Sequence, residues 1–141
     1  MNNKKGGILL GLLVVILVAH VLGMFRDWYH TIPDYDVPMH LLGGAWVVLF
    51  IFYLTDKGFP FLPSNYQRRP LISLCTLVAF AALVGVFWEL FEYSFDVFIA
   101  HKYVLIPSQD GLLDTIKDLV DDVLGGGVMA GVHILSERLR A

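Results

Sequence analysis

The first apolar stretch of the chain, residues 8–25, most constrains what it can fold into. It contains no acidic residue, lysine or arginine, and about 20 helical residues are enough to cross the roughly 30 Å hydrocarbon core of a bilayer. Lys4 and Lys5 precede it, as in a signal peptide, but no small-x-small cleavage site follows it. We therefore interpret residues 8–25 as an uncleaved first transmembrane helix.

Three more apolar stretches follow, and proline-containing loops separate them. They cover residues 38–54, 71–100 and 112–135. The intervening prolines are Pro33, Pro60, Pro63, Pro70 and Pro107. Hydrophobic residues make up 57% of the 141 positions and charged residues 16%, whereas average soluble domains carry about 25% charged residues. We expect a single all-α domain over residues 1–141, a polytopic membrane bundle of about four transmembrane helices.

Basic residues indicate how this bundle lies in the membrane, because lysine and arginine are retained on the cytoplasmic side. One side of the expected topology holds Lys4, Lys5, Lys57, Arg68, Arg69, Arg138 and Arg140. The other side holds Arg26 and Lys102. We therefore expect both termini to be cytoplasmic and the lipid bilayer to be the main partner. A net charge of −3 without a basic stripe argues against nucleic acid.

The same topology brings polar residues from several segments to one depth. His40 starts the second helix at its outer end, and Glu89 lies about 27 Å along the third, at about 1.5 Å per residue. The fourth helix starts outside and carries its acids in its first turns. The residues concerned are His40, Glu89, Glu92, Asp110, Asp114, Asp118, Asp121 and Asp122, with Asp34 and Asp36 in the loop above them. A shared polar site in the outer third of the bundle follows.

Spacing within each helix agrees with one inward face. Glu89 and Glu92 are three residues apart, and Asp114 and Asp118 are four apart, so each pair shares a side of its helix. A charged side chain at bilayer depth costs at least about 2.5–3.5 kcal/mol. Lysine and arginine are too few at this level to neutralise the acids. A bound metal ion or protonation of the carboxylates would resolve the excess charge.

The leading hypothesis is a carboxylate-rich metal site. We expect a divalent ion of Zn, Mn, Mg or Fe, with the ligands His40, Glu89, Glu92, Asp114 and Asp118. Its natural chemistry would be metal-assisted hydrolysis or transfer on a lipid-linked or envelope substrate. The candidate catalytic residues are Glu92, Asp110 and Asp121. The absence of Glu-x-x-His disfavours a ferritin-like di-iron site.

Other functions fit the same residues. The acids would form a relay in a cation or proton permease, or the polar face would dock another membrane protein or a second copy of the chain. Structural roles also remain open. Asp110 and Asp114 suit helix caps, and Glu89 would pair with Lys117 or Arg26. The acidic stretch would lie outside the membrane if the fourth helix began near Val120.

Three motifs occur in a fixed order along the chain. They are Asp36-x-x-x-His40-x-x-Gly43-Gly44, Trp88-Glu89-Leu90-x-Glu92, and Gln109-Asp110-x-x-x-Asp114-Thr115-x-x-Asp118 followed by Gly125. This combination resembles the YjdF-like bacterial inner-membrane proteins, which are related to the VanZ-like family, and it covers about residues 35–131. The resemblance implies an inner-membrane location and emphasises His40, Glu89, Glu92, Asp114 and Asp118.

Overall fold

The computed structural model describes residues 3–63, 65, 68–103, 105, 107–109 and 111–140, and within these ranges the regular structure is helical. The elements are α1 (Asn3–Phe25), α2 (Trp28–Thr31), α3 (Asp36–Asp56), α4 (Pro70–Phe95), the π-helical segment η2 (Asp96–Ala100), α5 (His101–Tyr103) and α6 (Leu112–Arg140). Four helical segments of the described chain are long and apolar enough to cross a membrane. The predicted all-α architecture of about four spanning helices is confirmed.

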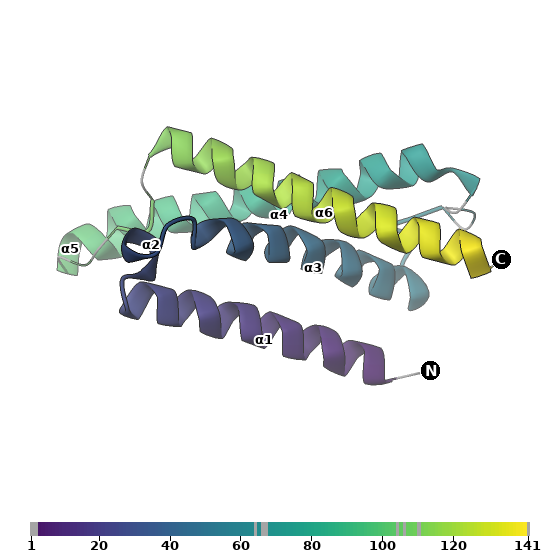
Figure 1. Ribbon diagram of the computed structural model, residues 1–141, viewed down its shortest axis with the longest axis horizontal. Helices are drawn as coiled ribbons and strands as arrows, with labels where there is room; N and C mark the ends of the chain where they lie inside the picture. Colours follow the sequence, from purple (N-terminus) through teal and green to yellow (C-terminus); the bar gives the residue numbers. More distant parts are fainter. Residues whose placement is uncertain are drawn as a thin grey trace.

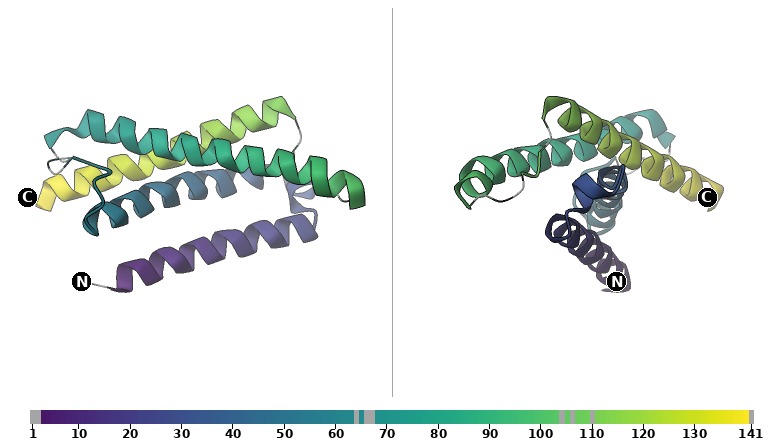
Figure 2. Two further views of the ribbon diagram at one scale, coloured as in Figure 1. Left: turned by 180° about the vertical axis from the view of Figure 1, so that it is seen from behind. Right: turned by 60° about the vertical axis from the view of Figure 1, so that its left-hand side comes forward.

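Three of these helices, α3, α4 and α6, form the core of the bundle (Figure 1). Their buried apolar side chains pack together around Val48, Phe52, Leu77 and Ile134. α1 lies beyond α3, on the side away from α6 (Figure 2). It packs mainly against α3 and the short α2, and the ring of His20 also contacts Trp88 of α4. α1 is therefore a peripheral helix attached to a three-helix core.

Glycines set the close crossing of α3 and α6, which is the most extensive helix contact in the bundle. A Cβ atom on Gly44 would overlap the backbone carbonyl of Asp122, and one on Gly125 would overlap the carbonyl of Leu41. Small residues let helix backbones approach at short range in a membrane. The crossing consequently places the acidic first half of α6 directly against the start of α3.

Both termini lie at one end of the bundle (Figure 1). At that end Lys5 Nζ lies 2.9 Å from Asp56 Oδ2 in an exposed ion pair. We call the opposite end, which carries α2, the start of α3 and the start of α6, the α2 end. Within the described residues, the polar candidates His40, Glu92 and Asp114 lie toward this end. Which side of the membrane it faces stays a prediction from the lysine and arginine distribution.

Candidate metal centre

His40 lies at the centre of the polar cluster, buried in the first turns of α3. Its Nε2 atom is 3.4 Å from Asp36 Oδ1 and 3.9 Å from Asp118 Oδ1. Ligand atoms of these three residues all lie within 4.8 Å of one another. Two ligands held about 2.1 Å from one ion are at most about 4.2 Å apart. Small side-chain rotations therefore suffice to place all three around a common ion.

Asp122 holds the other side of the imidazole ring. Its Oδ2 atom lies 3.3 Å from His40 Nδ1, and both side chains are buried. A neutral imidazole has one N–H and one lone pair. If Nδ1 donates its proton to Asp122, the Nε2 lone pair faces Asp36 and Asp118. A carboxylate placed behind a histidine in this way orients the ring and raises its basicity in metal sites.

The cluster carries more negative than positive charge. Asp118 is 1% exposed, and its Oδ1 atom has no hydrogen-bond partner among the described residues. Ligand atoms of Asp36 and Asp118 lie within 4.8 Å of each other, and two carboxylates at this distance repel each other unless a proton or a cation neutralises one of them. Lys117 Nζ lies 3.8 Å from Asp118 Oδ1 on a side chain that is 41% exposed. A divalent cation would offset the excess negative charge and satisfy the unpaired oxygen of Asp118.

Glu89 belongs to a neighbouring network on α4. Gln109 Nε2 donates to Glu89 Oε2 at 2.9 Å and lies 3.1 Å from Thr115 Oγ1. The partner that the structure gives Glu89 is thus an amide of the loop before α6, in place of the cations considered from the sequence. Its second oxygen, Oε1, is buried without a hydrogen-bond partner in the described part of the chain.

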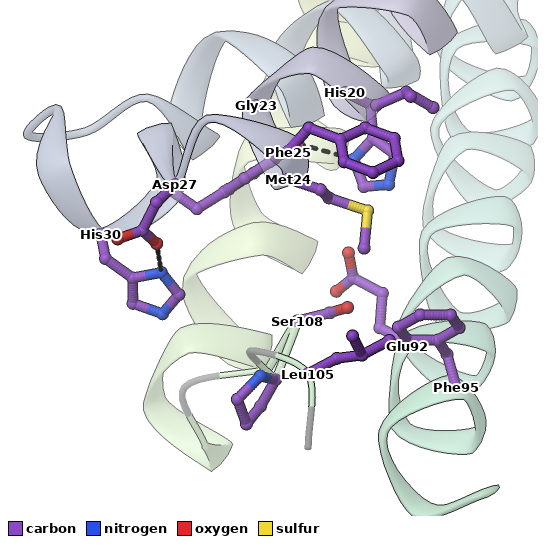
Figure 3. A pocket seen from close by; sticks show the side chains of 13 residues that line it. His20, Gly23, Met24, Phe25, Asp27, His30, Glu92, Phe95, Leu105 and Ser108 are labelled. Atoms are coloured by element: carbon purple, nitrogen blue, oxygen red, sulfur yellow. Dashed lines mark hydrogen bonds and ion pairs between the residues drawn. The ribbon is translucent and has the colours of Figure 1, made fainter. Parts of the chain in front are cut away.

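Glu92 faces a cavity of about 420 Å³ at the α2 end. Trp88 Nε1 donates to Glu92 Oε1 at 3.0 Å. The carboxylate points from α4 into the cavity toward Met24 of α1 (Figure 3). Glu92 is therefore a buried acid in the wall of this cavity.

Asp96 organises the loop that leads to α6. Its two carboxylate oxygens accept the backbone N–H groups of Ser108, at 2.8 Å, and Gln109, at 3.0 Å. Asp96 is buried at the point where α4 changes into the π-helical segment. These two hydrogen bonds, which we call the Asp96 clamp, hold Gln109 beside Glu89. The only sequence feature that points to Asp96 is its position four residues after Glu92, on the same helix face.

The remaining predicted residues take separate positions. Asp114 is half-buried in the first turn of α6, and Asp121 is half-buried with its Oδ2 atom unpaired within the described residues. Asp110 lies outside the described residues. Of the five predicted ligands, the structure groups His40 and Asp118 closely, and it adds Asp36 to them. The complete five-residue ligand set stays a prediction.

Two histidines have structural contacts in the same bundle. His20 Nδ1 lies 2.6 Å from the Tyr29 hydroxyl, and the His133 ring stacks on Phe52 at 3.8 Å between centroids. Burial raises the pKa of Tyr29 above its ordinary value, and the charge of Asp36 adds to this shift. Tyr29 therefore keeps its proton and can donate it to His20.

The family to which this bundle belongs follows from its sequence. Residues 6–138, nearly the whole chain, match the family described as "Predicted membrane protein (DUF2238)". The chain belongs to this family. The match is compatible with the YjdF-like resemblance, and the relation to the VanZ-like family stays an expectation from the motifs.

One relative and the solved structures complete the comparison. A protein of Thermotoga maritima, described as "Uncharacterized protein", is 31% identical over 121 residues. These residues are 83% of this chain and 56% of the Thermotoga protein. The chain therefore spans little more than half the length of that relative. No solved structure matches the chain.

Proposed function

We propose that this membrane protein binds one divalent metal ion at Asp36, His40 and Asp118. The single observation that carries this proposal is the mutual approach, within 4.8 Å, of ligand atoms from two buried residues, His40 and Asp118, and the partly buried Asp36. Asp122, behind His40, supports it, because a proton donated from Nδ1 to Asp122 would leave the Nε2 lone pair facing the cluster. Two carboxylates and one imidazole suit Mg, Mn, Zn or Fe.

The proposed chemistry is hydrolysis or transfer on a lipid-linked or cell-envelope substrate. A bound ion would supply Lewis acidity and a more acidic water molecule. Glu92 is the favoured candidate for a general base because its carboxylate faces the neighbouring cavity (Figure 3). Glu89 and Asp114 remain proposed further ligands, and Asp110 and Asp121 remain further candidate catalytic residues.

The proposed location is a bacterial inner membrane, with both termini in the cytoplasm. The lysine and arginine distribution supports this orientation. The α2 end, with the proposed metal centre, would then face the outer side of the membrane. Substrates attached to outer-leaflet lipids would approach the cluster from this side.

Metal analysis of the purified full chain tests the proposal. We expect about one divalent ion per chain by elemental mass spectrometry, as for a single site. The His40→Ala and Asp118→Asn variants should lose the ion, whereas Asp56→Asn, on α3 at the terminal end, should keep it. Helix content by circular dichroism identifies any variant that has lost its fold. A folded wild-type chain that contains no metal and takes up none on addition would overturn the proposal.

A proton or cation relay is the second candidate function. It is favoured by the buried carboxyl groups of Glu89, Glu92 and Asp118 and by the cavity that Glu92 lines. The test is flux through liposomes that contain the full chain. A cation-dependent flux that is lost in Glu92→Gln would support the relay. Liposomes that contain the wild-type chain and show no proton or cation flux would exclude it.

An accessory subunit is the remaining alternative. In that case a partner membrane protein or a second copy of the chain would remain attached after gentle detergent extraction. A solitary chain under the same conditions would count against this role.

A further inference from the structure

A second cavity, of about 160 Å³, borders the polar cluster at His40 and Asp122 and extends from there toward the middle of the bundle; we call it the inner cavity. Apolar side chains from three membrane-spanning helices line most of it, including Leu13 and Ile16 of α1, Val47 of α3, and Ala81 and Val84 of α4. α1 packs along α3 and does not pack extensively against α4 or α6 in the described chain. The cavity therefore lies beside a peripheral helix at hydrocarbon depth.

The size and lining of this cavity favour hydrocarbon. An apolar cavity of about 150 Å³ in a protein core stays dry and binds benzene. An unfilled cavity also loses the dispersion contacts of its walls. Within a bilayer, the apolar material at hand is the chains of the surrounding lipids. A chain segment of about benzene size would restore these contacts.

The two cavities are neighbours. His20 and Tyr29, which lie 2.6 Å apart at their hydrogen-bonding atoms, line both of them. The larger cavity at the α2 end, which we call the outer cavity, also has polar side chains in its wall. They include Asp27, Glu92 and Ser108 (Figure 3). From the middle of the bundle to the α2 end, the lining therefore changes from apolar to mixed polar. A lipid in the leaflet at that end is oriented in the same way, with its apolar chain toward the middle of the bilayer and its polar head group toward the surface.

The buried polar pair completes this arrangement. His40 and Asp122 both line the inner cavity, next to its apolar walls. A hydrocarbon chain at that place would exclude water from the pair, and hydrogen bonds are electrostatically stronger where the local dielectric is low. An occupied cavity thus adjoins the cluster without competing for its ligand atoms.

We propose that one hydrocarbon chain of a membrane amphiphile occupies the inner cavity and that its polar group lies in the outer cavity beside Glu92. This inference deepens the proposed function, because it names a single-chain amphiphile or one chain of a lipid as the substrate class. Its role as a substrate rests on the proposed metal site. Binding of the chain is a separate property with its own readout.

Photolabelling of the full chain in vesicles tests the inference. The vesicles contain phosphatidylethanolamine, phosphatidylglycerol and a phospholipid with a diazirine in its acyl chain. After irradiation, mass spectrometry locates the labelled residues. We expect labels to concentrate on residues 13–20 of α1 and 81–88 of α4. Annular lipid alone would label lipid-facing residues such as Leu90 and Val128 just as strongly, and would overturn the inference.

A pair of valines on α4 provides a matched comparison. Val84 and Val86 are 44% and 41% exposed, but Val84 lines the inner cavity and Val86 is not among its lining residues. Val84→Trp should reduce labelling of both segments by at least about fivefold, because the indole fills the space of the chain. Val86→Trp should leave labelling nearly unchanged. Equal effects of both variants would contradict a chain in this cavity.

A second pair on α1 guards against a folding defect in Val84→Trp. Leu17 lines the inner cavity, and Val18, next to it, is not among the lining residues. Leu17→Trp should repeat the loss of labelling, and Val18→Trp should not. Metal content is measured on the same samples. If the protein is free of metal but its labelling still depends on the inner cavity, the metal site alone is refuted. If the protein contains metal but shows no labelling that depends on the cavity, the hydrocarbon-chain site alone is refuted.

Discussion

The Nδ1 atom of His40 on α3 lies 3.3 Å from Oδ2 of Asp122 on α6, across 82 residues of sequence. This contact fixes the orientation of a buried imidazole whose Nε2 atom faces Asp36 and Asp118. The glycine crossing of α3 and α6 makes the approach possible, because Gly44 lies directly against the backbone of Asp122. Packing and chemistry in this bundle therefore depend on the same pair of helices.

Asp122→Asn should weaken metal binding without abolishing it. Loss of a carboxylate behind a ligating histidine costs about 10–100-fold in metal affinity, and the isosteric amide preserves the packing. Chelator competition on the purified chain measures the dissociation constant. Glu137→Gln, at the far end of α6, is the control and should bind as wild type does. Unchanged affinity in Asp122→Asn would show that this residue does not support a metal ligand.

Gly125→Ala should destabilise the bundle. Its added Cβ would overlap the carbonyl of Leu41, and overpacking of this kind typically costs about 1–3 kcal/mol. Unfolding in increasing mole fractions of sodium dodecyl sulfate measures the loss. Gly131→Ala, on the same helix, is the matched control because a Cβ at Gly131 meets no heavy atom within 4 Å. Equal stability of the two variants would contradict the close crossing.

Asp96→Ala should release the loop before α6. Hydrogen bonds to a charged group contribute about 1.5–3 kcal/mol, so exchange of the Ser108 and Gln109 amides should accelerate by at least about tenfold. Hydrogen–deuterium exchange with peptide mapping provides the measurement. Ser94→Ala removes an exposed hydroxyl that donates to Leu90 O on α4, and it should leave loop exchange unchanged. Slow exchange in Asp96→Ala would exclude the clamp.

Trp46→Phe should loosen α1. Trp46 Nε1 donates to the backbone carbonyl of Leu9 at 2.8 Å, which ties α1 to α3. A hydrogen bond of this type contributes about 0.5–1.5 kcal/mol net. Pulsed electron resonance between spin labels on α1 and α4 should show a broader distance distribution. Phe50→Leu removes the ring stacked on Trp46 but keeps the hydrogen bond, so its distribution should stay narrow.

The sequence was sufficient to predict the four spanning helices and the end of the bundle where the polar residues gather. Membrane thickness sets helix length, and alternate helices run in opposite directions, so His40 and Asp118 had to lie at a similar depth. Neither constraint fixes how each helix is rotated about its axis. The contact of Gly44 with α6 decides that Asp118 and Asp122 face His40.

Two further contacts depended on where helices and loops begin and end. Asp36 and His40 are four residues apart in a motif of the sequence, but Asp36 joins His40 on one helix face because α3 begins at Asp36. Asp96 accepts two backbone N–H groups from a loop more than ten residues away. Such loop contacts arise from the path of the chain between helices. Helical spacing therefore found the face of α4 but not the role of Asp96.

The separation of His40 from Asp122 also affects how the protein is made. α3 enters the membrane well before α6 has been synthesised, so Asp36 and His40 first meet the bilayer without the acids that later surround them. A charged side chain at that depth costs at least about 2.5–3.5 kcal/mol. Until α6 inserts, Asp36 and His40 therefore lack the acidic partners that they have in the complete bundle.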